Sequence, residues 1–139
     1  MNGAYLDHIG IAVLPGSPLA KCLTVLGLSI TSSEEVAAEK VAVDWIPLPQ
    51  KPCKLELLHA SDPQSAVAKY LDRHKRDGVH HLSFRVDAVA ATSAALQAAG
   101  FQMVYDTARP GAHSCLVNFV HPSTTGGVLV EITEKARGH

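Results

Sequence analysis

The feature that most constrains the fold of this chain is an internal repeat. Four blocks align in order, at offsets that rise only from 73 to 75 residues: 8–13 with 81–86, 19–28 with 92–101, Val43 and Trp45 with Val117 and Phe119, and 55–57 with 130–132. Single-residue insertions in two loops would produce this slow drift. The chain is therefore expected to contain two copies of one supersecondary unit.

Each copy is predicted to form one strand, one helix and then three further strands. Two-residue alternation of apolar positions indicates the strands, and apolar positions at helical spacing indicate the helices. The predicted strands are 5–13, 28–34, 41–48 and 54–59 in the first copy and 80–86, 101–105, 114–120 and 127–133 in the second, with helices at 18–26 and 88–99. Gly27 and Gly100 are repeat-equivalent and follow these helices, where a positive φ is often required.

Residues 62–77 between the copies are predicted to form a linker helix. Asp62 is the expected N-cap, and Pro63 would occupy the first helical position. Four residues, Val67, Tyr70, Leu71 and His74, would share one face of this helix. The predicted fold class is α+β: two βαβββ modules, at about residues 5–60 and 79–134, form a cupped mixed sheet in one domain that spans residues 1–139.

Composition excludes several classes of function. The chain has 139 residues and a formal net charge of −1, with both signs of charge mixed along it, so neither a nucleic-acid partner nor a membrane partner is expected. Three widely spaced cysteines indicate a reducing compartment and not a disulfide framework. We find no signal-peptide pattern and no apolar run of the roughly 20 residues that a membrane helix needs. A cytoplasmic location is expected.

Two histidines and two glutamates form a candidate metal site. The repeat pairs His8 with His81 and Glu56 with Glu131, and all four lie opposite the aliphatic positions of their strands. A single histidine on a strand is usually structural, whereas a carboxylate in an apolar strand is costly unless it is paired. Two imidazoles and two carboxylates suit Zn²⁺, Co²⁺, Ni²⁺ or Mn²⁺. Such a set leaves open positions on an octahedral ion, which favours a catalytic site.

The adjacent His80 and His81 must face opposite sides of their strand. His81 is the predicted ligand because it aligns with His8. Ser83 lies on the same polar face, where small and polar residues leave room for a ligand, and it is a candidate substrate contact. His113, in the loop "RPGAHS", is a second candidate for contact with substrate, the alternative being an ordinary loop role.

The remaining histidines are expected to have structural or solvent-exposed roles. His59 and His74 are predicted to lie at the surface, and His139 in a solvated terminus. His121 precedes a proline and is expected to cap a turn. The run "TTGG" at 124–127 is predicted to form a tight turn between strands.

Several motifs give the chain a resemblance to a known family. "LDHIGIAV", "LELLHA", "GVHHLSFRVD" and "NFVHPSTTGGVLVEI", together with the linker "SAVAKYL", resemble the methylmalonyl-CoA epimerases of the vicinal oxygen chelate superfamily. The similarity runs over nearly the whole chain. It implies a glyoxalase/bleomycin-resistance-like fold with one divalent ion, most often Co²⁺, and assembly as a homodimer. The ligands implied are His8, Glu56, His81 and Glu131.

The resemblance also implies the chemistry. The family interconverts (2R)- and (2S)-methylmalonyl-CoA by removing and returning the C2 proton through a metal-stabilised enolate. Inversion needs a base on each side of C2, and the resemblance implies that Glu131 is one of them. The substrate implied is an acyl-CoA.

The second base is implied by a segment that departs from the family pattern. Residues 34–48, "EEVAAEKVAVDWIPL", correspond to a family segment resembling "EEVPEQGVKVAFLPL". Without gaps, the family's glutamate falls on Ala38 and its glycine on Lys40, so Glu39 is one position late. A loop before a strand can accommodate a shift of one residue in the alignment. Glu39 is therefore the predicted second base. Glu34 and Glu35 are weaker candidates, and an ordinary solvated glutamate is the alternative.

Two other functions remain open at this point. Bacterial glyoxalase I, a lactoylglutathione lyase, also uses two histidines and two glutamates. The ending "HPSTTGGVLVEI" and the "GAH" loop favour the epimerase, because glyoxalases typically have a "DPDG" turn there. A non-catalytic small-molecule-binding protein of the same fold is the third possibility, although such proteins often lack the full ligand set.

Overall fold

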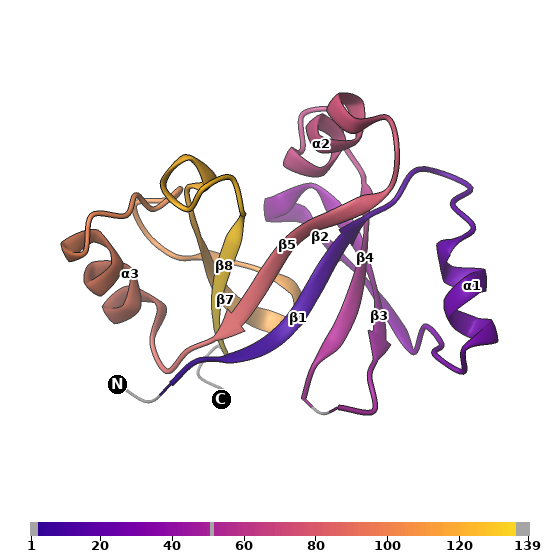
Figure 1. Cartoon of the computed structure of the whole chain (residues 1–139), viewed down its shortest axis with the longest axis horizontal. Coiled ribbons are helices and arrows are strands. Elements are labelled where there is room, and N and C mark those ends of the chain that lie inside the picture. The colour runs from indigo at the N-terminus through magenta and orange to yellow at the C-terminus, as the bar shows by residue number, and fades with distance from the viewer. Residues whose placement is uncertain (1–2, 51, 136–139) are drawn as a thin grey trace. The chain divides into compact units, whose positions relative to one another are not determined.

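The structure is a computed structural model that describes residues 3–50 and 52–135, with an α+β arrangement of three α-helices and eight strands in those ranges (Figure 1). The strands are β1 (Tyr5–Ala12), β2 (Ser32–Val36), β3 (Val41–Pro47), β4 (Lys54–Ala60), β5 (Gly78–Arg85), β6 (Arg109–Pro110), β7 (Cys115–Val120) and β8 (Val130–Lys135). The α-helices are α1 (Leu19–Val25), α2 (Ala66–His74) and α3 (Val89–Ala98). Within the described ranges, no helix has the length and apolar character needed to span a membrane.

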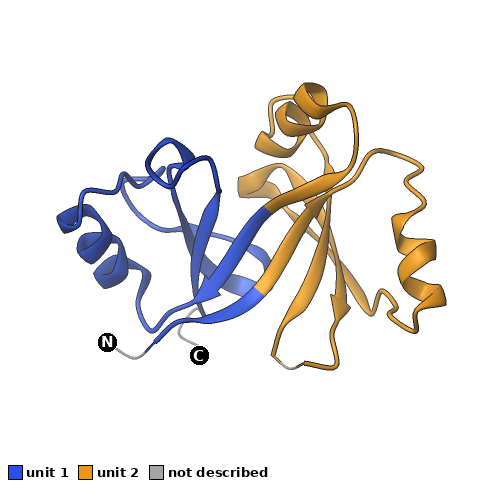
Figure 2. Cartoon of the chain, in the orientation of Figure 1, with its two compact units in different colours: residues 1–7, 81–139 blue, residues 8–80 orange. Residues whose placement is uncertain are grey.

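The chain divides into two compact units. Unit 1 contains residues 1–7 and 81–139, and unit 2 contains residues 8–80 (Figure 2). The boundaries fall inside β1 and β5, so each of these strands contributes residues to both units.

Unit 2 has the strand order β2-β3-β4-β1. The β2–β3 and β3–β4 pairs are antiparallel, and β4 runs parallel to β1. Helix α1 has no side-chain cap, and its stability comes from the apolar core between it and the strands. The buried residues of that core are Val13, Leu23, Ile46 and Leu57. Each buried Leu or Ile side chain contributes about 1.5–3 kcal/mol to folding, which holds α1 against this face of the strands.

Unit 1 has the strand order β5-β8-β7-β6. The β5–β8 pair is parallel, and the β7–β8 and β6–β7 pairs are antiparallel. Helix α3 packs on β7 and β8. Its first N–H, from Val89, donates to the Glu134 carboxylate at 2.8 Å, so a strand residue satisfies an N–H that has no partner within the helix.

The strand registers confirm the internal repeat. In unit 2, Glu56 is paired with Trp45 on β3. In unit 1, the repeat-equivalent Glu131 is paired with Phe119 on β7. On its other side, each glutamate is paired with a residue two positions after a histidine: Glu56 with Gly10, and Glu131 with Ser83. The two copies therefore share one pairing pattern.

The N-cap predicted for the linker helix is wrong. Helix α2 begins at Ala66, and its N-cap is Ser65, whose hydroxyl accepts a hydrogen bond from the Ala68 N–H at 3.0 Å. The Asp62 carboxylate instead accepts from the Gln64 N–H at 2.7 Å, which closes a local turn. Of the residues predicted to share one face, Val67 and Leu71 are buried, whereas His74 is exposed.

The strand predicted at 101–105 is absent from the described structure. This segment makes a single bridge, between Met103 and Val120. The buried Asn118 side chain then accepts from the Tyr105 N–H at 3.1 Å and donates to the Tyr105 carbonyl at 3.0 Å. A side-chain amide thus satisfies backbone groups that a ladder would otherwise pair, and the edge strand β6 forms later, at Arg109–Pro110. Similarly, β2 starts at Ser32, four residues after the predicted position.

The glycine turns agree with expectation. Gly27 and Gly100 have φ of 85° and 98° after α1 and α3. Gly126 and Gly127 have φ of 77° and 99°, so "TTGG" is a turn, and β8 begins only at Val130. The His121 side chain accepts from the Ser123 N–H at 3.2 Å, which confirms its predicted capping role. His139 lies outside the described residues.

Candidate metal centre

Each unit contains one buried histidine–glutamate pair. In unit 2, Nδ1 of His8 lies 3.1 Å from Oε2 of Glu56, and both side chains are under a tenth exposed. His8 comes from β1 and Glu56 from the neighbouring parallel strand β4. Side chains alternate between the two faces of a strand, so His8 and Glu56 point away from the apolar core beneath α1. The neighbouring Ile11, Leu55 and Leu57 point into that core.

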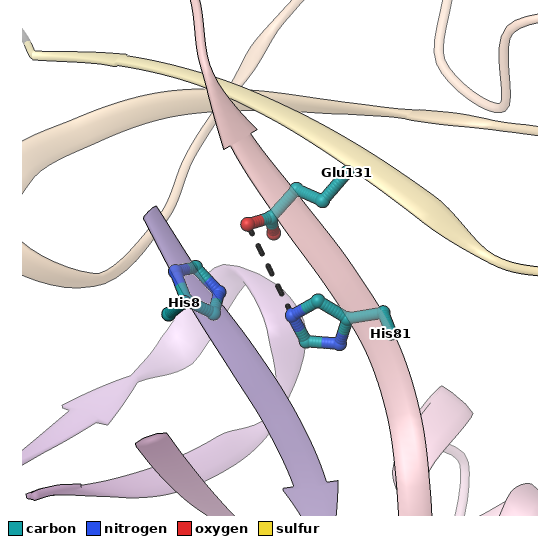
Figure 3. A group of neighbouring side chains, drawn as sticks. All are labelled: His8, His81 and Glu131. Atoms are coloured by element: carbon teal, nitrogen blue, oxygen red, sulfur yellow. Dashed lines mark ion pairs between the residues drawn. The ribbon is translucent and has the colours of Figure 1, made fainter. Parts of the chain in front are cut away.

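Unit 1 repeats this arrangement. Nε2 of His81 lies 4.0 Å from Oε1 of Glu131, and these side chains are also under a tenth exposed. The imidazole of His81, on β5, faces the carboxylate of Glu131, on β8 (Figure 3). The structure therefore places His8 beside Glu56, and His81 beside Glu131.

These donors suit a divalent metal ion. His8, His81 and Glu131 are buried, and each can offer one ligand atom. Neutral imidazole and carboxylate are the ligands that Zn²⁺, Co²⁺, Ni²⁺ and Mn²⁺ share. A buried carboxylate is costly without a compensating partner, and a cation is such a partner. The chemistry of the four side chains therefore fits a metal site better than it fits an apolar core.

In unit 1, a line of ring contacts leads from His81 through Phe119 and Tyr105 to Arg109. The Phe119 ring meets the His81 ring edge to face at 5.8 Å between centroids. Tyr105 meets Phe119 in the same way at 6.0 Å, and the Arg109 guanidinium lies 3.9 Å from the Tyr105 ring centroid. Phe119 is the register partner of Glu131, so its ring restricts the orientation of the imidazole beside this carboxylate.

The neighbouring histidine has a different environment. His80 meets the Tyr70 ring of α2 edge to face at 5.3 Å. The Tyr70 hydroxyl also donates to the Val79 carbonyl at 3.1 Å, which ties α2 to β5 within unit 2. Alternation along β5 therefore separates a buried His81 beside Glu131 from a half-buried His80 beside α2.

The predicted second base lies in a short turn. Glu39 ends a 3-10 helix (Ala37–Glu39), and it is half-buried. The next residue, Lys40, has φ of 57° and ψ of 44°, a left-handed conformation that glycine adopts most readily. In the gap-free alignment, this is the position where the family pattern carries glycine. Glu34 is half-buried and Glu35 exposed on β2.

The two candidate substrate contacts differ in exposure. Ser83 is fully buried, at 0% exposure. His113 is exposed in a turn between β6 and β7, with φ of 57°. Of the histidines expected at the surface, His59 is partly exposed and lies 2.8 Å from the Asp44 carboxylate, and His74 is exposed beside Tyr70.

The sequence did not reveal one partly buried ion pair of unit 1. An Arg85 guanidinium nitrogen donates to the Asp7 carboxylate at 3.0 Å, and Asp7 is only 5% exposed. Asp7 immediately precedes His8, so this contact helps to hold the start of the strand that carries the first histidine. The partners are 78 residues apart and have no repeat-equivalent pair, so no sequence signal joined them.

Comparisons with known proteins give a consistent picture. A family model described as "Glyoxalase/Bleomycin resistance protein/Dioxygenase superfamily" matches residues 7–119. The chain is 32% identical over 135 residues to the mitochondrial methylmalonyl-CoA epimerase of Bos taurus, with coverage of 96% of this chain and 75% of the relative. It is also 32% identical over 132 residues to the ethylmalonyl-CoA/methylmalonyl-CoA epimerase of Cereibacter sphaeroides, with coverage of 93% and 96%.

A solved structure is similarly close. A methylmalonyl-CoA epimerase in complex with methylmalonyl-CoA and NH4+ matches the chain with a TM-score of 0.88 at 28% identity. The match covers 96% of this chain and 95% of that chain.

Proposed function

Because the chain belongs to the glyoxalase/bleomycin resistance protein/dioxygenase superfamily, as an epimerase-like member, we propose that it is a metal-dependent methylmalonyl-CoA epimerase. It would interconvert the (2R) and (2S) forms by exchanging the proton on C2. The observation that carries the metal dependence in this proposal is the pair of buried His–Glu contacts at repeat-equivalent positions. Relatives at 32% identity with the same activity in their names support it.

The proposed metal site combines both pairs. His8, Glu56, His81 and Glu131 would hold one divalent ion, for which we propose Co²⁺, with Zn²⁺, Ni²⁺ and Mn²⁺ as ions of similar ligand preference. When bound, the ion would supply Lewis-acid stabilisation of the negative charge that develops on the thioester oxygen.

Two carboxylates would move the proton. Inversion at C2 requires a proton acceptor on one face and a donor on the other, and the roles exchange with the direction of reaction. We assign Glu131 to one face and Glu39 to the other. A positioned carboxylate of this kind typically accelerates proton transfer by about 10²–10⁴-fold. The half-buried position of Glu39, in a turn that leads directly into β3, suits such a role.

The substrate is proposed to be an acyl-CoA. This rests on the methylmalonyl-CoA complex of the related epimerase. The exposed His113 would contact the substrate from the turn before β7. Assembly as a homodimer is part of the same proposal.

A glyoxalase I-like activity is the second candidate, because the matching family model includes the glyoxalases. It would use the same four metal ligands on a glutathione hemithioacetal. The two activities differ in substrate, so one pair of assays separates them.

The decisive experiment is proton exchange in D₂O. Purified protein loaded with Co²⁺ is mixed with methylmalonyl-CoA, and the loss of the C2 proton signal is followed by NMR. We expect exchange that stops when a chelator removes the metal, and no turnover of the methylglyoxal–glutathione hemithioacetal. The reverse pattern would assign the protein as a glyoxalase. Inactivity on both substrates, with tight binding of another small molecule, would indicate a binding protein.

A further inference from the structure

Ser83 is a buried hydroxyl whose role the proposed reaction does not yet explain. It lies two residues after His81 on β5, so strand alternation places both side chains on the same face. Its exposure is 0%, and its Oγ is buried without a hydrogen-bond partner in the ranges that the structure describes. Buried polar groups nearly always have a partner, so this hydroxyl indicates an interaction that forms in another state of the protein.

The nearest charged group by strand register is the carboxylate of Glu131. Ser83 and Glu131 are paired residues of the parallel strands β5 and β8. Side chains paired in this way share one face, and their Cβ atoms lie about 5 Å apart. Rotation about the Glu131 side-chain bonds is therefore sufficient to bring a carboxylate oxygen within hydrogen-bond distance of the Ser83 hydroxyl.

The first copy of the repeat has no such hydroxyl. Gly10 is the repeat equivalent of Ser83 and is the register partner of Glu56. The two candidate metal-binding carboxylates therefore have the same strand pairing but different neighbours. The hydroxyl accompanies only Glu131, which the proposed function uses both as a ligand and as a base.

We propose that Ser83 is a positioning residue that donates a hydrogen bond to the Glu131 carboxylate when the divalent ion is bound. This inference rests on the proposed function. A carboxylate that binds a metal through one oxygen keeps its second oxygen for a hydrogen bond, and such outer-shell partners hold ligands in place. Direct contact with substrate, the role first expected of Ser83, is disfavoured because the side chain is fully covered.

Ser83→Ala tests this role, and Ser93→Ala is the matched control. Ser93 lies on α3 of the same unit, and its Oγ is likewise buried without a hydrogen-bond partner in the described ranges. Co²⁺ affinity is measured by titration of the cobalt absorption bands, and the melting temperature of the metal-free proteins by circular dichroism. We expect the dissociation constant for Co²⁺ to rise by about 10–100-fold in Ser83→Ala and to stay unchanged in Ser93→Ala.

The metal-free proteins provide the second readout. Both variants remove a hydroxyl that has no partner in the metal-free state, so both should melt at or above the wild-type temperature. Wild-type Co²⁺ affinity in Ser83→Ala would overturn the proposal, as would a lower melting temperature of this variant without metal. If the wild-type protein binds Co²⁺ but does not exchange the C2 proton, the proposed function fails, while the affinity ratio still decides the role of Ser83.

Discussion

Nδ1 of His8 lies 3.1 Å from Oε2 of Glu56, although the two residues come from strands 48 positions apart in the chain. The equivalent His81 and Glu131 form the corresponding contact at 4.0 Å. A contact that recurs in both copies of the repeat is a property of the repeated unit, since each copy turns one imidazole and one carboxylate to the same face of its strands.

The first prediction uses the adjacent histidines as a matched pair. His81→Ala should weaken Co²⁺ binding by at least about 100-fold, because losing a ligand costs more than losing an outer-shell partner. His80→Ala should retain wild-type affinity, because His80 faces Tyr70 on the other side of β5. Metal content after dialysis is measured by elemental analysis. Full occupancy in His81→Ala would show that the ligand set is wrong.

Glu39 is the subject of the second prediction. Glu39→Gln keeps the shape of the side chain but removes the proton acceptor, so epimerisation should fall by at least about 100-fold with unchanged metal content. Asp72→Asn, which changes an exposed carboxylate of α2, serves as the control. The rate is measured by exchange of the C2 proton in D₂O. Near-normal exchange in Glu39→Gln would assign the second base to another residue or to a water molecule.

The third prediction concerns the start of α2. Ser65→Ala should lower the free energy of unfolding by about 1 kcal/mol, because it removes the acceptor for the Ala68 N–H. Asp62→Ala should cost less, since Asp62 accepts from Gln64 in a turn outside the helix. Urea unfolding followed by circular dichroism measures both values. A larger decrease in the free energy of unfolding for Asp62→Ala than for Ser65→Ala would show that Asp62 is the N-cap.

The sequence alone was sufficient to predict the repeat, the order of strands and helices in each copy, and the equivalence of His8 with His81 and of Glu56 with Glu131. These properties depend on spacing along the chain. Alternation assigns His81 and His80 to opposite faces of one strand, and a nearly constant offset makes Glu56 and Glu131 equivalent. The strand registers then reproduce this equivalence, with Trp45 and Phe119 opposite the two glutamates.

The tertiary structure decided which of several suitable groups forms each contact. Asp62 and Ser65 are both good caps, and only the path of the chain into α2 selects Ser65. Asn118 replaces a predicted strand pairing with side-chain hydrogen bonds to Tyr105. The Asp7–Arg85 pair joins residues 78 positions apart. The spacing of residues determines which face of its own strand a side chain occupies. Contacts between segments depend on how the chain folds in three dimensions, and a local sequence pattern does not contain that information.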